Sequence, residues 1–153
     1  MTPRVDRRFA ILLPLALIAG CASPRRRSFS GTPVLRPVDA KAAAAAISSY
    51  RRRSGLGAVR PDQILTTAAE QQARAVAAAG DLSHGDFAGR MERLGQDAAW
   101  ENLALGPTTI AGVIQLWRES PGHDRNLLMR DATRIGIARV DAEAPYWALV
   151  LAR

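Results

Sequence analysis

The chain contains only two histidines, and each lies in a segment that also holds carboxylates and small residues. His84 belongs to Ser-His-Gly-Asp at positions 83–86, and His123 belongs to a longer segment at positions 117–128. Glu101 lies between them in the sequence. Because imidazole can act as an acid, a base or a neutral metal ligand near pH 7, these three side chains are the first candidates for chemistry.

Two kinds of chemistry are open to His84, Glu101 and His123. Two neutral imidazoles and a carboxylate can hold Zn²⁺ and leave one position for a water, which the metal activates for hydrolysis. Without a metal, Glu101 could orient a histidine that acts as a base. No short metal-binding motif is present, so only the fold can bring the three residues together. The alternative is structural: Glu101 and Asn102 hold a connecting segment through backbone groups, and His123 serves the first turn of a short helix.

Other polar residues near these positions are predicted to support His84, Glu101 and His123. Ser120 precedes Pro121, and this pair is typical of a helix cap followed by the first helical residue. Ser83 stands beside a histidine but lacks the glycine-containing turn that presents a nucleophilic serine. Asn102 and Asn126 are expected to lie around these three residues. Asn126 is expected to join loops.

The N-terminus has the pattern of a bacterial lipoprotein signal. Basic residues precede an apolar run at 9–19, which is too short to span a bilayer. Small residues then lead to Cys21, at the place where a lipobox has the cysteine that becomes acylated. We therefore predict a signal peptide at 1–20 and lipidation of Cys21; the alternative is an ordinary signal peptide with an incidental cysteine. Since Cys21 is the only cysteine, no internal disulfide is expected.

The chain is basic, with 21 Lys and Arg residues, 14 Asp and Glu residues and a formal net charge of +7. Lys41 is the only lysine, and arginine triplets stand at 25–27 and 51–53. This charge could attract anionic lipid or cell-wall polymer, although solvated faces of an arginine-rich protein explain it as well. Export, the low aromatic content of 5% and the lack of a nucleic-acid motif argue against a nucleic-acid partner.

Composition divides the mature chain into a tether and one domain. Residues 21–38 are rich in Pro, Ser and Arg, and residues 39–153 are enough for one domain with its own core. Within the domain, Asp39 is predicted to cap a helix that runs to Arg53. Further helical patterns are expected at 61–80, 87–94 and 108–117, followed by a short helix that starts at Ser120.

Apolar residues at helical spacing predict which faces of these helices are buried. On the helix at 61–80 this face consists of Ile64, Leu65, Ala68, Ala69, Gln72 and Val76. On the helix at 108–117 it consists of Ile110, Val113, Ile114 and Trp117. Trp100 and Trp147 are expected to be buried or half-buried, with the lining of a groove as the alternative.

The C-terminal region changes from a helical pattern to an alternating one. Ile135 and Ile137 alternate with small residues, and a second apolar run follows at 146–151. These patterns predict two neighbouring antiparallel strands. Helices first and paired strands last indicate an α+β fold.

The order of these motifs resembles that of the CAP superfamily, also called the SCP domain, which comprises cysteine-rich secretory, antigen 5 and pathogenesis-related 1 proteins. The resemblance covers about residues 39–152, is most specific at 117–128 and is greatest with the short bacterial members. It implies a three-layer α-β-α sandwich with a small central antiparallel sheet. It also implies that His84, Glu101 and His123 lie in a cleft that better-known members line with two histidines and two glutamates.

The fourth position of that cleft differs in this chain. It is occupied by Ser120, and the neighbouring Glu119 need not reach the same cleft, because one residue turns a helical side chain by about 100°. The role of Glu119 stays open. Since some members bind Zn²⁺ through the histidine pair, the resemblance implies a metal site at His84 and His123, with Glu101 as a further candidate ligand.

Together these features predict an exported lipoprotein of the bacterial cell envelope that acts as a monomer. Its expected partners are the membrane, reached through acylated Cys21, and a small ligand, lipid or cell-wall component. We favour a non-enzymatic module whose His/Glu cleft binds such a ligand or a divalent metal. The alternatives are a metal-assisted hydrolase acting on peptide or cell-wall material, and a purely structural interaction domain.

Overall fold

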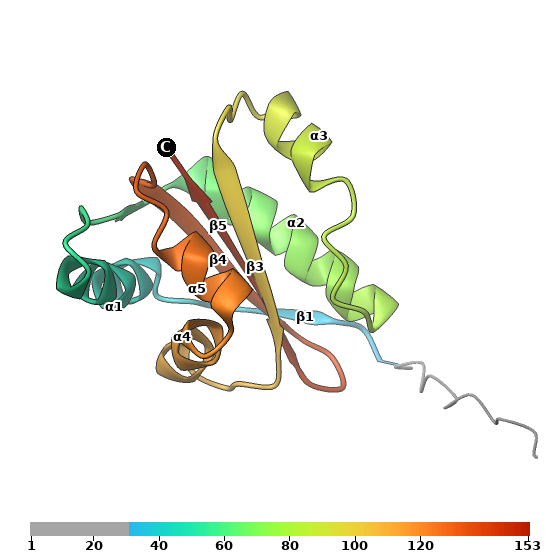
Figure 1. Ribbon diagram of the computed structural model, residues 1–153. Coiled ribbons are helices and arrows are strands. Elements are labelled where there is room, and N and C mark those ends of the chain that lie inside the picture. Colours follow the sequence, from blue (N-terminus) through green and yellow to red (C-terminus); the bar gives the residue numbers. More distant parts are fainter. Residues whose placement is uncertain (1–30) are drawn as a thin grey trace, which may run out of the picture.

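A computed structural model describes residues 31–153, so the predicted signal peptide, Cys21 and the first part of the tether lie outside the described residues. Figure 1 shows helices on both sides of a central sheet. The helices are α1 (Ala40–Arg53), α2 (Gln63–Ala79), α3 (Phe87–Arg93), α4 (Ile110–Arg118) and α5 (Pro121–Leu127). The strands are β1 (Val34–Arg36), β2 (Arg60–Pro61), β3 (Ala99–Leu105), β4 (Arg134–Asp141) and β5 (Pro145–Ala152). None of these helices has the length and apolar character needed to cross a membrane.

The sheet is built around the antiparallel hairpin of β4 and β5, and its strand order is β1-β4-β5-β3. β3 pairs antiparallel with β5 over its whole length, from Ala99 opposite Ala152 to Leu105 opposite Tyr146. On the other side, β1 pairs antiparallel with one end of β4, and the two-residue β2 pairs parallel with the other end. In this order β3 is an edge strand, and within the described residues no strand pairs with its outer side.

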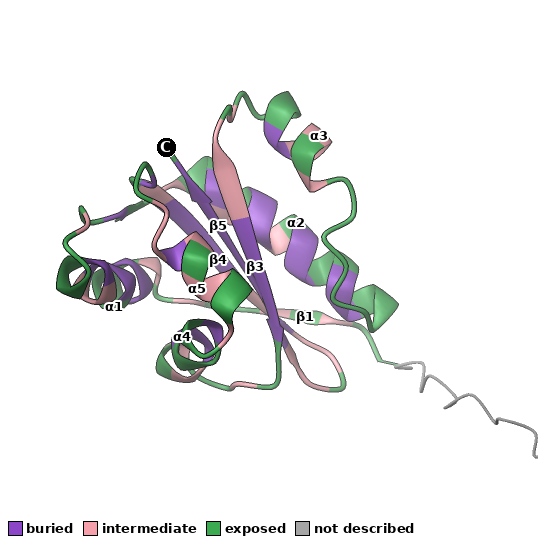
Figure 2. Cartoon of the chain, viewed as in Figure 1, coloured by how far each residue is buried: buried purple, intermediate pink, exposed green. Residues whose placement is uncertain are grey.

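The side chains of β5 alternate between two apolar clusters, one on each face of the sheet. Trp147, Leu149 and Leu151 pack with residues of α1, α4 and α5. Tyr146, Ala148, Val150 and Ala152 pack with residues of α2. Figure 2 shows the buried sides of the helices turned toward the buried strands. The predicted α+β fold, a three-layer α-β-α sandwich with a small central antiparallel sheet, is confirmed.

Small residues bring α2 close to the sheet. The helix buries mainly alanines, and β4 has Gly136 beneath them. A Cβ atom on Gly136 would lie 2.0 Å from the carbonyl carbon of Leu65, which is helix backbone. Only a residue without a side chain fits at this crossing.

Large side chains and one buried arginine hold the opposite face together. Trp117 is fully buried, as predicted, and its Nε1 donates to the carbonyl of Leu103 at 3.1 Å. Arg51 is also fully buried, although the sequence placed it in a charged last turn. No ion pair of residues 31–153 involves its guanidinium, and burial lowers the pKa of Arg51. Its N–H groups are satisfied by the carbonyls of Gly57, Leu127, Met129 and Ala132, at 2.8 to 2.9 Å.

Several predicted helix ends are confirmed and one is wrong. Asp39 caps α1 by accepting a hydrogen bond from the N–H of Ala42, and Gly80 ends α2 in the left-handed conformation. Pro61, however, lies in β2 and not in the helix. Asp62 caps α2 instead, because its carboxylate accepts the Leu65 N–H at 3.0 Å.

Ile64, in the first turn of α2, is 51% exposed rather than buried as predicted. The other residues predicted for the buried face of this helix are buried: Leu65, Ala68, Ala69, Gln72 and Val76. On α4, which begins at Ile110 after the cap Thr109, Val113, Ile114 and Trp117 are buried and Ile110 is partly buried.

Three strands were not predicted, and the first two of them are short. β1 lies inside the segment 21–38 that the sequence suggested as a tether, so sheet pairing begins before Asp39. β2 has only two residues. β3 contains Glu101 and Asn102, which the structural alternative had placed in a connecting segment. The last of these strands is the one that carries the site.

Candidate functional site

Two buried polar residues stand side by side on the edge strand β3. Glu101 and Asn102 are 4% and 0% exposed, although each carries a polar side chain. Since neighbouring residues of a strand point to opposite faces, Glu101 points toward the side of α2 and α3 and Asn102 toward the side of α5. Each makes hydrogen bonds on its own side, so β3 connects two groups of polar residues.

Glu101 accepts hydrogen bonds from two charged or chargeable side chains. His84 Nδ1 lies 2.8 Å from Oε1 of Glu101, and Arg90 Nη2 lies 2.7 Å from Oε2. Only 1% of the glutamate side chain is exposed, compared with 53% of the histidine side chain. Arg90 also donates to the backbone carbonyl of His84 at 3.0 Å. The carboxylate therefore fixes an imidazole whose outer edge remains open to solvent.

The protonation of Glu101 reflects opposing effects. Burial raises the pKa of Glu101 above its usual value, while the hydrogen bond from His84 and the charge of Arg90 oppose this shift. In the neutral form of His84, the hydrogen bond to ionised Glu101 holds the ring proton on Nδ1. Nε2 of His84 then presents a lone pair, which is the arrangement of a metal ligand or a base.

The loop before α3 brings His84 to this carboxylate. Gln72, buried on α2, donates to the carbonyl of Ser83 at 2.7 Å. Gly85 takes a positive φ of 52°, and Asp86 then caps α3 by accepting the Gly89 N–H at 3.0 Å. The histidine is therefore held between a helix, a tight turn and the start of the next helix.

A network of asparagines connects β3 to α5 on the other side. Asn102 Nδ2 donates to the carbonyl of His123 at 3.0 Å. Asn126 Nδ2 donates to the carbonyl of Glu101 at 3.0 Å and to Oδ1 of Asn102 at 2.9 Å. Both asparagines, expected in the shell around the cleft, thus fix the backbone that carries Glu101 and His123.

His123 lies within the electrostatic reach of His84. Burial lowers the pKa of His123, and the charge of His84 lowers it further, so the neutral ring is favoured at pH 7. Ser120 occupies the N-cap position of α5, but its side chain makes no capping hydrogen bond. The turn is closed instead by the Ser120 carbonyl, which accepts the Asp124 N–H at 2.8 Å. The prediction that Ser120 caps through its side chain is therefore wrong.

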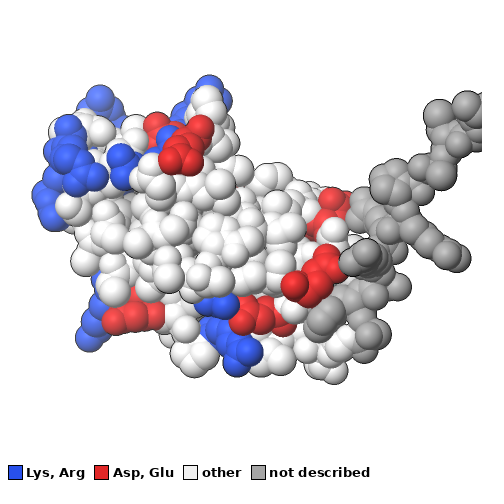
Figure 3. Space-filling view, turned by 90° about the horizontal axis from the view of Figure 1, so that it is seen from below, with Lys and Arg blue, Asp and Glu red and all other residues white. Residues whose placement is uncertain are grey.

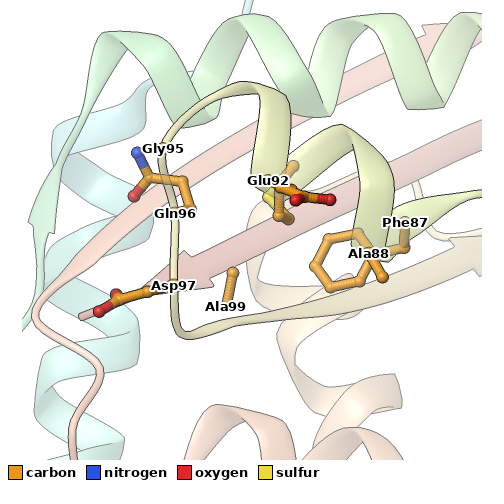
Figure 4. Close-up of a pocket in the computed structure, with 8 residues that line it drawn as sticks. Phe87, Ala88, Glu92, Gly95, Gln96, Asp97 and Ala99 are labelled. Atoms are coloured by element: carbon orange, nitrogen blue, oxygen red, sulfur yellow. The ribbon is translucent and has the colours of Figure 1, made fainter.

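A separate hollow lies on the far side of α3. It measures about 620 Å³ and lies between α3 and the start of β3, where Phe87, Met91 and Ala99 line it together with Glu92 and Gln96. Figure 4 shows Phe87 and Ala88 on one side of this hollow and Gln96 and Asp97 on the other. None of His84, Glu101 and His123 lines it. The histidine site and the hollow are therefore distinct features that share α3.

The family comparison agrees with the motifs and with the fold. The family described as the cysteine-rich secretory protein family, or CAP, matches residues 44–151. The chain belongs to the CAP family. A comparison with curated protein sequences gave no match.

Solved CAP and SCP proteins of bacteria share the fold. An outer surface protein from Borrelia burgdorferi is 20% identical with a TM-score of 0.67, over 78% of this chain and 98% of that chain. An extracellular SCP-domain protein from Bacillus anthracis is 23% identical with a TM-score of 0.66, over 73% and 39%. A cysteine-rich secretory protein from Staphylococcus aureus is 15% identical with a TM-score of 0.62, over 77% and 41%. This chain thus spans about two-fifths of the latter two proteins.

The described residues do not offer three protein ligands to one metal ion at this CAP site. Both oxygens of Glu101 are engaged by His84 and Arg90. Within residues 31–153, no group of three or more His, Cys, Asp and Glu side chains is placed to hold a metal ion. Nε2 of His84 and the neutral ring of His123 remain as donors. Glu101 is suited to orient His84, as outer-shell carboxylates do.

Two positioning residues could not be recognised from the sequence. Arg90 occupies the second oxygen of Glu101, and Gln72 holds the loop that carries His84. Gln72 was predicted only as part of a buried helix face, where a polar residue is itself a signal of a specific partner. For Arg90 the sequence offers no comparable signal, because arginines are spread along the whole chain.

Proposed function

We propose that this CAP-family protein is exported, is held at the bacterial cell envelope by an acylated Cys21, and binds a divalent metal ion through His84 and His123. A small ligand of the envelope would complete the coordination of that ion. The observation that carries the proposal is the 2.8 Å contact between a buried carboxylate, Glu101, and an imidazole that is half exposed. A buried group that orients an accessible histidine is the arrangement found around metal-bound histidines in proteins.

The electrostatics of the site support a weak and selective ion site. His123 has a lowered pKa and is neutral at pH 7, as a ligand must be. Arg90 neutralises Glu101, so the carboxylate adds little attraction for a cation. Two imidazoles and outer ligands favour borderline transition metals such as Zn²⁺ over Ca²⁺ or Mg²⁺, which prefer oxygen. We expect weaker affinity than that of a site with three protein ligands.

Zinc titration by calorimetry tests the ion site. Wild type should bind one Zn²⁺ at pH 7.5, and His84→Ala and His123→Ala should each abolish the binding heat. Glu119→Gln is the matched control, because this exposed residue follows α4 and its carboxylate accepts a hydrogen bond from Gln115 of that helix. Glu101→Gln should weaken binding without abolishing it, since the orienting hydrogen bond becomes weaker. Equal Zn²⁺ affinity in wild type and both histidine variants would contradict the metal site.

Export and anchoring form the second part of the proposal. The N-terminal pattern ends at Cys21, and two of the similar proteins are described as an outer surface protein and an extracellular protein. Since a single acyl chain binds membranes only marginally, stable anchoring would need the two or three chains of a bacterial lipoprotein. Mature protein should fractionate with membranes, and Cys21→Ser should accumulate as unprocessed precursor. Soluble mature protein with a free Cys21 thiol would contradict the anchor.

One observation also supports the hydrolase alternative. The Glu101–His84 pair has the geometry of a base and the group that orients it. In that case water would be the nucleophile, because the Ser83 hydroxyl is engaged with the Gly85 N–H and Ser120 has no hydrogen bond to a histidine among the described contacts. Turnover of cell-wall peptides by wild type, lost in His84→Ala, would establish this alternative. If wild type leaves the cell-wall peptides uncleaved, the result would favour the binding function.

A further inference from the structure

Two arginines from different helices converge on one tyrosine at the end of α1. The ring of Tyr50 is half-buried, with the guanidinium carbon of Arg118 4.5 Å from its centre and that of Arg53 5.6 Å away. The Tyr50 hydroxyl donates to Asp124 of α5 at 2.6 Å. Stacking on an aromatic ring restricts a guanidinium while its N–H groups can still donate. One nitrogen of each is engaged, since Arg53 donates to Ser49 at 3.3 Å and Arg118 donates to Gln115 at 3.0 Å, and the other nitrogens are left for a partner.

Further exposed arginines lie at the same end of the molecule. The buried Arg51 donates to the carbonyls of Leu127 and Met129, which draws the end of α1 against the turn after α5. Arg52, Arg125 and Arg130 are close in sequence to residues that make these contacts, so they belong to the same end of the molecule. We call this surface the arginine face; it consists of Arg52, Arg53, Arg118, Arg125 and Arg130, all exposed.

The arginine face keeps a net positive charge, because its arginines form no ion pairs and outnumber the nearby carboxylates. Among the ion pairs of residues 31–153, none involves these five arginines. Three carboxylates are near in sequence: Asp124, which accepts from Tyr50, Glu119, which accepts from Gln115, and Asp131. Because these donors are uncharged, the carboxylates keep their charge, and the five arginines exceed them by two positive charges. Figure 3 shows basic side chains gathered at the α1 end, whereas the described chain begins at the other end, at β1 (Figure 1).

We infer that the arginine face binds an anionic polymer that carries repeated phosphate or carboxylate groups. Guanidinium forks match both groups through paired hydrogen bonds, and all five residues of the face are arginine. The five arginines are spread over α1, α4, α5 and the turn after α5. This spread suits a polymer with many negative charges better than one small anion. This interaction is independent of the histidine site.

A soluble polymer fits this surface better than a membrane does. Interfacial membrane binding requires apolar side chains that enter the acyl boundary beside the basic residues. The exposed large apolar residues of the described chain are Val34, Ile64, Leu82, Leu94, Leu105 and Leu116. Only Leu116 shares a helix with a residue of the arginine face. The surface therefore lacks the apolar component of a membrane-binding face.

Binding of defined polymers by the full chain tests this inference. The probes are linear polyphosphate, polygalacturonate, and phosphatidylcholine vesicles with phosphatidylglycerol, each at physiological salt. The test variant is Arg53→Gln/Arg118→Gln/Arg125→Gln. The control variant is Lys41→Gln/Arg74→Gln/Arg93→Gln, which removes the same charge from α1's first turn, α2 and α3. Circular dichroism and thermal melting confirm that both variants are folded.

The test variant should bind polymer at least about tenfold more weakly than wild type, with a shallower salt dependence, and the control should stay within about threefold. Preference for polyphosphate or for polygalacturonate then identifies phosphate or carboxylate as the recognised group. A variant with lysine at the same three positions should bind at an intermediate level, because it keeps charge and loses the fork. Equal weakening in test and control variants, no polymer binding by wild type, or binding to vesicles alone would each overturn the inference.

Discussion

The two faces of the sheet are packed by opposite means. On the side of α1, α4 and α5, large residues such as Trp117 and Trp147 interlock, and the buried Arg51 ties three segments together. On the side of α2, alanines and Gly136 allow the helix backbone to approach the strands directly. The first face depends on side-chain volume and the second depends on its absence. We therefore expect the first face to be destabilised most by substitutions that remove side-chain volume, and the second face by substitutions that add it.

The candidate site draws on both faces. His123 is carried by α5 on the large-residue face, while His84 follows α2 on the small-residue face, and the edge strand β3 joins them through Glu101 and Asn102. Rotation of either layer relative to β3 would separate the two histidines. The packing of both layers against β3 therefore also sets the positions of His84 and His123.

The largest effect is expected from removing volume on the large-residue face. Trp117→Ala should lower the free energy of unfolding by about 3–5 kcal/mol, because a fully buried ring leaves a cavity and the carbonyl of Leu103 loses its donor. Chemical denaturation measures this change. Leu116→Ala, on the same helix but 40% exposed, is the control and should change stability by less than about 1 kcal/mol. Similar losses in both variants would show that the packing assigned to α4 is wrong.

Adding volume on the small-residue face should have the next largest effect. In Gly136→Ala the new methyl group would meet the backbone of Leu65 and Thr66, which cannot move aside as a side chain can. We expect a loss of about 1–3 kcal/mol in the free energy of unfolding, from overpacking. Gly57→Ala, where nothing lies within 4 Å, serves as the control and should be nearly neutral. A neutral Gly136→Ala would mean that α2 lies farther from β4 than described.

The sequence predicted elements whose determinants are local. Asp39 caps α1 through a residue three positions away, and Gly80 ends α2 through its own backbone conformation. β4 was recognised because Ile135 and Ile137 alternate with small residues, and β5 because its apolar run fits a strand that is buried on both faces. By contrast, β3 was missed because Glu101 and Asn102 are buried on opposite faces, which removes the alternation of polar and apolar residues.

Features that depend on distant contacts could not be predicted. Arg51 looks like its neighbours in the triplet, and only the carbonyls of a turn about 80 positions away select it for burial. Glu101, His84 and His123 were identified through the family motifs, and the structure brings Glu101 and His84 into contact. The partner Arg90 was not identified, because no local pattern pairs a residue of α3 with β3.

Removing hydrogen bonds that connect α5 to β3 should have a moderate effect on the free energy of unfolding. Asn126→Ala removes two hydrogen bonds, to the Glu101 carbonyl and to Oδ1 of Asn102, in a part-buried setting. We expect a loss of about 1–3 kcal/mol, since the partners are left without a donor. Hydrogen exchange should show faster opening of β3 and α5 than of α2. Gln115→Ala, an exposed residue of α4, is the control; uniform acceleration across all elements would contradict a specific join.

The smallest effect concerns a charge that fastens α2 to β4. Burial alone would raise the pKa of Asp62, but hydrogen bonds from the backbone at Leu65 and from Arg134, and the charge of Arg134, lower it overall. Because the folded-state pKa lies below the unfolded value of about 3.9, this group stabilises the protein above that pH. The contribution is lost as the pH falls through the folded-state pKa. It should therefore be present at pH 7 and absent in strong acid.

Asp62→Asn separates this charge effect from helix capping, because asparagine caps helices about as well as aspartate. At pH 7 the variant should lose up to about 1 kcal/mol, the range of ion pairs that are not deeply buried; the Asp62 and Arg134 side chains are 18% and 21% exposed. As the pH is lowered from 5 toward 2, the unfolding free energies of wild type and variant should converge, because the wild-type carboxylate becomes protonated. Denaturant unfolding at several pH values measures both curves. A difference that stays constant down to pH 2 would show that the carboxylate of Asp62 acts on α2 through its shape and not through its charge.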